Sequence, residues 1–86
     1  MIFDGAIVKE QGVEFVIIVV KRHVIGSLPT REKTIGAFEL EFPGRPIILM
    51  AQDSKGTPEY YGRKDIVNYL ANIDPRRIPW QKITIN

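Results

Sequence analysis

Phe15-Val16-Ile17-Ile18-Val19-Val20 is a run of six consecutive apolar residues, five of which are β-branched. The run is too short to cross a membrane, and it lacks the polar–apolar alternation of a strand with one face in water. Such a segment is typical of an interior strand that other elements cover on both faces. It therefore predicts an α/β domain with this strand at the centre of its sheet.

The chain has 86 residues, of which 44% are hydrophobic, and this size predicts a single globular domain over residues 1–86. It contains no cysteine, which excludes disulfides, thiol catalysis, thiolate zinc sites and iron–sulfur clusters. The first residues, Met1-Ile2-Phe3-Asp4-Gly5, show neither the basic nor the apolar region of a secretion signal. We expect a soluble cytoplasmic protein that does not bind membranes.

The net charge is +2, and the basic excess lies in the second half of the chain. Residues 1–43 carry five Lys or Arg against six Asp or Glu, whereas residues 44–86 carry seven against four. Domains that bind nucleic acid usually show a denser basic stripe, so this excess is only a weak indication of an acidic partner.

The first half of the chain predicts a hairpin followed by a helix. Residues Ile2–Lys9 and Val13–Val20 read as two antiparallel strands, joined by a turn at Gln11-Gly12. Ser27 or Thr30 can cap the helix, which keeps Pro29 in or just before its first turn.

This first helix has one apolar face and a clear end. Its apolar residues are Ile35, Phe38 and Phe42. Pro43-Gly44 ends it.

The second half predicts a further hairpin, a second helix and a final strand. Pro46 opens a strand at Ile47–Ala51, and a turn at Asp53–Gly56 leads to a short edge strand at Pro58–Tyr61. A helix then begins at Arg63 and stops at Asp74-Pro75. The tail, residues 80–85, alternates like an edge strand with one wet face.

These elements predict one compact two-layer α/β (α+β) domain in the order ββαββαβ, with a mixed sheet of four or five strands and two helices. We expect Val13–Val20 and Ile47–Ala51 at the centre of the sheet. The expected core residues are Val16, Ile18, Val20, Phe38, Phe42, Ile48, Val67 and Leu70.

The layout of residues 13–73 resembles a shortened thioredoxin. In that family the loop before the first helix carries Cys-Gly-Pro-Cys, and a cis-proline precedes a later strand. Here Ser27 and Thr30 would stand for the two cysteines and Pro46 for the cis-proline. Because no thiolate is present, the resemblance implies a binding scaffold and no disulfide exchange.

No pattern in the sequence indicates a catalytic, cofactor-binding or metal-binding residue. His23 and Ser27 follow the buried strand, where α/β sheets tend to form ligand crevices, yet no nucleophile elbow presents the serine. One histidine and scattered carboxylates do not make a metal site, and Glu39 and Glu41 are two apart, which points them to different sides of a helix. No phosphate-binding glycine loop occurs either.

One group of basic and aromatic residues in the second half suggests weak binding of single-stranded nucleic acid. Basic groups neutralise phosphates while aromatic faces stack bases. The residues are Arg45, Lys55, Tyr60, Arg63, Lys64, Arg76, Arg77, Trp80 and Lys82. Tyr61 points away from Tyr60 in a strand, so only one of the two tyrosines can join such a surface.

A protein-contact domain is the function that these features favour. Edge strands at both chain ends and Trp80 offer an apolar, hydrogen-bonding surface, and a domain this small gains stability when a second copy covers it. Nucleic-acid binding is the first alternative, and an enzyme of unrecognised type is the second.

Overall fold

The computed structural model describes residues 1–10 and 12–85, so the expected turn residue Gln11 lies outside the described residues. The elements are β1 (Ile2–Glu10), β2 (Val13–Val19), α1 (Arg22–Gly26), α2 (Leu28–Glu41), β3 (Ile47–Gln52), β4 (Pro58–Tyr61), α3 (Lys64–Ala71), the 3₁₀ turn η1 (Pro75–Arg77) and β5 (Gln81–Thr84).

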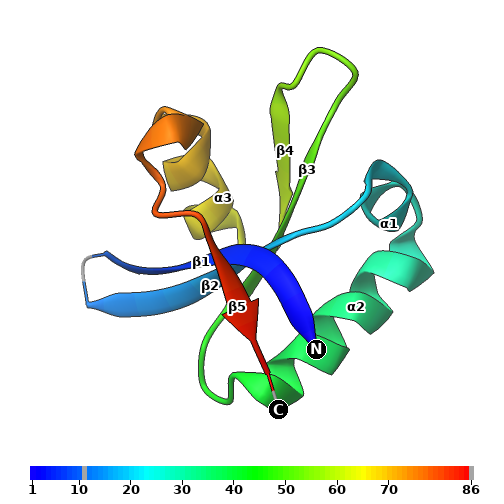
Figure 1. The fold of residues 1–86 in the computed structure, drawn as a ribbon, viewed down its shortest axis with the longest axis vertical. Coiled ribbons are helices and arrows are strands. Elements are labelled where there is room, and N and C mark those ends of the chain that lie inside the picture. The colour runs from blue at the N-terminus through cyan, green and yellow to red at the C-terminus, as the bar shows by residue number, and fades with distance from the viewer. Residues whose placement is uncertain (11, 86) are drawn as a thin grey trace.

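The strands form one mixed sheet in the order β4-β3-β2-β1-β5 (Figure 1). β2 and β3 run parallel at its centre, and the other neighbours are antiparallel. The predicted fold class, a single-sheet α/β domain with a mixed sheet, is confirmed. The two expected central strands are indeed neighbours.

The number of layers differs from the prediction, because the helices lie on opposite faces of the sheet (Figure 1). Phe15 and Ile17 of β2 point to one face and pack with α3, whereas Val16 and Ile18 point to the other and pack with α1 and α2. A strand that is apolar on both sides needs cover on both sides. The domain therefore has three layers, with the sheet in the middle.

Helix α2 begins and ends where the sequence indicates. The Ser27 hydroxyl accepts a hydrogen bond from the Thr30 amide, and the helix stops at Phe42. Phe42 and Phe38 both meet the ring of Phe3 edge-on, with centroids 6.3 and 5.1 Å apart. These contacts fasten the carboxyl end of α2 to the first strand of the sheet.

Helix α1 is an element that the sequence did not predict. It is a single turn with a polar beginning, and its Ile25 side chain is buried against the α2 face of the sheet. Its two apolar residues, Val24 and Ile25, are adjacent and give no helical period. Burial of Ile25 on the sheet is what distinguishes this segment from a loop.

The expected elements of the second half all form, although α3 and β5 are shorter than predicted and β3 is one residue longer. Asp53 accepts hydrogen bonds from the Lys55 and Thr57 amides and so closes the expected turn. Helix α3 spans Lys64–Ala71, and β5 begins at Gln81, one residue after Trp80.

Most of the expected core is buried. Five of those eight side chains are buried, namely Val16, Ile18, Phe42, Ile48 and Leu70. The other three are half-buried and pack against the two cores.

The thioredoxin resemblance fails at its proline. No peptide bond among the described residues is cis, so Pro46 does not play the part of a cis-proline. Ser27 is the N-cap of α2, and its side chain accepts a hydrogen bond from the Thr30 amide.

None of the helices described is both long and apolar enough to cross a membrane.

The central strand can be tested with one buried charge. Ile18 is 1% exposed, so Ile18→Asp places an unpaired carboxylate in the core and is expected to cost more than about 4 kcal/mol, enough to unfold a domain of this size. Thermal melting followed by circular dichroism measures the effect. Ile2→Asp is the control, because Ile2 is 67% exposed; a normal melt of Ile18→Asp would contradict the central position of β2.

Candidate binding groove

The aromatic residues of the proposed nucleic-acid surface are packed against the core. Tyr60 and Trp80 both lie on the α3 face of the sheet, half-buried against its core. Burial raises the pKa of Tyr60, and its hydroxyl has no hydrogen-bond partner among the described residues. The Trp80 indole N–H donates to the Pro75 carbonyl over 2.8 Å. Neither ring is a free stacking platform.

Four basic residues of that group are already neutralised by acidic neighbours. The ion pairs are Arg45–Glu14, Arg63–Asp65, Arg76–Asp74 and Lys82–Asp4. Hydrogen bonds from Arg76 lower the pKa of Asp74 to about 2. A paired cation has less charge to offer a phosphate.

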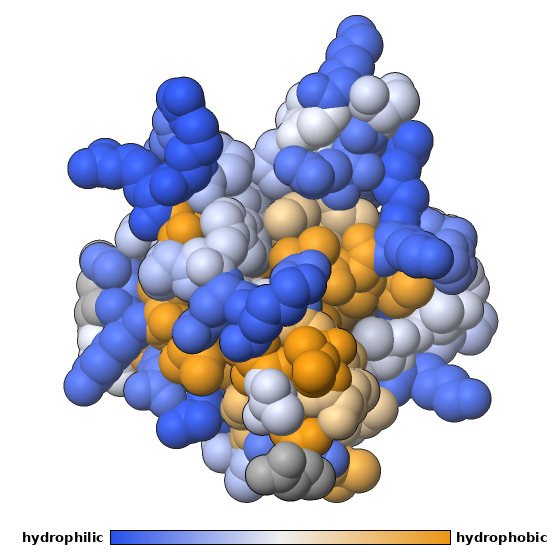
Figure 2. All heavy atoms as spheres, viewed as in Figure 1, coloured by the Kyte–Doolittle hydropathy of each residue, from blue (hydrophilic) through white to orange (hydrophobic). Residues whose placement is uncertain are grey.

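The other basic residues of the group are spread over separate elements. Lys55 lies in the β3–β4 turn, Lys64 starts α3, and Arg77 ends η1. Trp80 and Lys82 both line a shallow hollow of about 390 Å³, which Asp4 also lines. Figure 2 shows apolar side chains in the middle of this view, between polar projections. The structure thus brings two of the nine residues together at this hollow.

The expected crevice residues do not form a site with each other. His23 is exposed on α1, and Ser27 caps α2. Among the described residues, neither His23 nor Ser27 lines the Trp80 hollow, the groove beside α2 or the small hollow beside Phe15 and Tyr69. Within the described ranges, no three acidic or histidine side chains gather closely enough to hold a metal ion.

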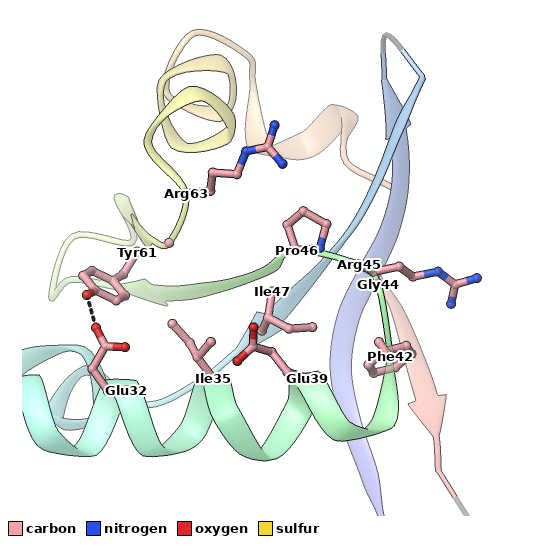
Figure 3. A pocket seen from close by; sticks show the side chains of 11 residues that line it. Glu32, Ile35, Glu39, Phe42, Gly44, Arg45, Pro46, Ile47, Tyr61 and Arg63 are labelled. Atoms are coloured by element: carbon pink, nitrogen blue, oxygen red, sulfur yellow. Dashed lines mark hydrogen bonds between the residues drawn. The ribbon is translucent and has the colours of Figure 1, made fainter.

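A groove of about 480 Å³ lies between α2 and the region where β3 begins and β4 ends (Figure 3). We call it the α2–β4 groove. Its lining residues are Glu32, Ile35, Glu39, Phe42, Gly44, Arg45, Pro46, Ile47, Tyr61, Gly62 and Arg63. The α2 wall carries Glu32, Ile35 and Glu39, which are spaced so that they share one side of the helix.

Gly62 lets the chain turn from β4 into α3 directly beside the groove. Its φ is +156°, and a Cβ atom there would lie 2.6 Å from Ile48 Cδ1 and 2.9 Å from the Ile47 carbonyl oxygen. Only glycine permits so close an approach of the two backbones. This approach sets the distance between the β4 wall and the floor at Ile47.

Tyr61 joins the two walls of the groove. Its hydroxyl donates to Glu32 Oε1 over 2.5 Å, and the Arg31 guanidinium carbon lies 4.1 Å from the centre of its ring. The hydrogen bond to Glu32 raises the pKa of Tyr61. Tyr61 and Glu32 are 29 residues apart in the sequence, so this contact ties α2 to the edge strand.

The uncompensated charge of the groove is negative, although the protein as a whole is positive. The guanidinium of Arg45 is paired with Glu14, and that of Arg63 is held by both oxygens of Asp65 at 2.8 Å. Glu39 also lines the groove, and it has no hydrogen bond or ion pair with any described residue. An amphipathic cation is therefore the kind of group that this groove suits.

Glu39 and Glu41, the pair singled out from the sequence, point to different sides of α2. The glutamates that line the groove are Glu32 and Glu39, which are two turns apart on this helix. That spacing is visible in the sequence. The opposing wall at Tyr61 is not, because it depends on how β4 packs beside α2.

No protein-family model matches this chain, and neither a curated protein nor a solved structure shows significant similarity to it. Its function must be argued from its own geometry.

The close approach at Gly62 predicts opposite effects for two glycine substitutions. Gly62→Ala is expected to destabilise the domain by about 1–3 kcal/mol, because it adds a clash at a positive φ. Gly36→Ala, in the middle of α2 with no atom within 4 Å of the new Cβ, is expected to stabilise it by about 0.5–1 kcal/mol. Chemical denaturation measures both, and equal effects would contradict the close approach.

The Tyr61–Glu32 contact can be read from the ionisation of Tyr61. The hydrogen bond favours the neutral phenol, so the pKa of Tyr61 is higher in the folded state than in the unfolded chain. The stability that the bond adds to the folded state is therefore complete below the ordinary tyrosine pKa and is lost as the pH rises through the higher pKa of the folded state. Glu32→Gln removes the charge and is expected to lower the pKa of Tyr61. Phenolate absorbance, assigned by difference from Tyr61→Phe, measures the shift.

Glu41→Gln is the matched control, since Glu41 lies on the same helix but does not line the groove. An unchanged pKa of Tyr61 in Glu32→Gln would mean that the contact does not persist in solution.

Proposed function

We propose that this domain works by protein contact and that it self-associates through the outer edge of β1. The observation that carries the proposal is the unequal length of β1 and its outer neighbour. β1 has nine residues, but β5 pairs only with Ile2–Gly5. The outer edge of residues 6–10 has no strand beside it in the described sheet.

The hydrogen-bonding groups on this open edge follow from the β1–β5 ladder. The Ile85 amide donates to the Met1 carbonyl, and the Met1 amine donates to the Ile85 carbonyl. Antiparallel pairing alternates, so every second residue of β1 directs its N–H and C=O groups toward the β5 side. Ile7 and Lys9 come next in this series, beyond the end of β5. Their backbone groups are available to a second chain.

The side chains on this edge suit a second copy of the chain. Ile7 is 37% exposed and lies on the same face of β1 as Lys9. If two copies pair antiparallel about Val8, Ile7 of each lies opposite Lys9 of the other. The aliphatic part of the lysine then covers the isoleucine while its ammonium group stays in water.

The association is expected to depend on concentration and on Ile7. Light scattering on a sizing column, from about 10 to about 500 µM, should show dimer growing with concentration, as mass action requires. Ile7→Lys should give a monomer throughout, because it places two charges of the same sign close together on the shared edge.

Leu40→Lys is the control, because Leu40 is 84% exposed on α2 and far along the chain from β1. It should leave the dimer unchanged. A monomeric wild-type protein, or a dimer lost in Leu40→Lys and kept in Ile7→Lys, would contradict the proposal.

A further inference from the structure

We infer that the α2–β4 groove and the outer edge of β4 together bind an extended segment of a partner protein that carries a lysine or arginine side chain. This deepens the proposed function, since it rests on protein contact and names the chemistry of a partner. It uses the edge of the sheet opposite to β1.

β4 is an end strand whose outer edge offers a short template for pairing. Its hydrogen bonds to β3 continue from the Asp53–Thr57 contact, where the Asp53 amide donates to the Thr57 carbonyl. By alternation, Glu59 and Tyr61 face β3, whereas the backbone groups of Pro58, Tyr60 and Gly62 face outward. Proline has no N–H to offer, so the free donors are the amides of Tyr60 and Gly62.

The groove begins where this edge ends. Tyr61 at the end of β4 and the next residue, Gly62, line it on one side. Glu32 and Glu39 line it from α2 (Figure 3). A strand added beside β4 would point alternate side chains to the α2 face of the sheet. One such side chain would stand over the two glutamates.

The lining selects a long cationic side chain for that position. Ile35 on the α2 wall and Ile47 on the floor give an apolar surface along which an aliphatic stem can lie, and Glu39 offers a carboxylate with no partner among the described residues. The nearby arginines are paired with Glu14 and Asp65 and do not neutralise it. An acidic side chain would be repelled, and a purely apolar one would leave the carboxylates without a counter-charge.

The experiment is a selection from a displayed library of random heptapeptides, carried out on the Ile7→Lys variant so that self-association plays no part. The expected result is enrichment of peptides with one lysine or arginine flanked by β-branched residues, the pattern of an added strand. A selected peptide, made synthetically, should bind saturably and slow hydrogen exchange of the Tyr60 and Gly62 amides.

The glutamates and their control separate a specific site from general charge attraction. Glu32→Gln combined with Glu39→Gln should weaken the peptide about tenfold, the sum expected for two partly exposed ion pairs, while Glu41→Gln should change it less than about twofold. Melting curves verify that each variant is folded.

The inference would be overturned by the absence of enrichment, by enrichment of peptides without a basic residue, or by an equal loss of peptide affinity in Glu41→Gln and the groove variant. Binding of agmatine, a small molecule with a guanidinium and an ammonium group on one aliphatic chain, as tightly as the peptide would also overturn it, because the site would then be one for small cations. A monomeric wild-type protein would contradict only the self-association through β1.

Discussion

The parallel pairing of β2 with β3 is the constraint on which the rest of this structure depends. Val16 pairs with Ile47 and Val19 with Met50, and both strands are apolar on both faces. Parallel neighbours cannot be joined by a tight turn, so the chain must cross over one face before it returns. Helices α1 and α2 make that crossover and bury Val16 and Ile18. The opposite face is then left for α3, which explains why the sheet has helices on both sides.

The same arrangement creates the two edges of the sheet. A centre made of β2 and β3 leaves β4 on one side and the long β1 with the short β5 on the other. β4 has four residues and begins with Pro58, two features that limit unwanted pairing along an open edge. Lys9 does the same for the uncovered part of β1. Each edge is thus open over a short length, which suits a specific contact better than indiscriminate aggregation.

Local ion pairing determines which charges remain available at the surface. Arg45, Arg63, Arg76 and Lys82 all lie in the basic half of the chain, yet each has a carboxylate within ion-pairing distance. Exposed pairs of this kind add little to stability, but they remove charge from the surface that a ligand meets. The carboxylates of α2 have no such basic partner within the described residues. An acidic groove on a chain of net charge +2 is the result.

The sequence by itself determined the elements whose causes are local. The β-branched run at 15–20 predicted the central strand, the Ser27 cap and the spacing of Phe38 and Phe42 predicted α2, and Asp53 predicted its turn, because each signal lies within a few residues. Tertiary structure alone decided which helix covers which face of the sheet, and with it helix α1, the strand order and the α2–β4 groove. These depend on contacts between distant segments, such as Ile25 with the sheet and Tyr61 with Glu32. A local sequence pattern indicates which side of a strand or helix is apolar, but it does not indicate which distant segment covers that side.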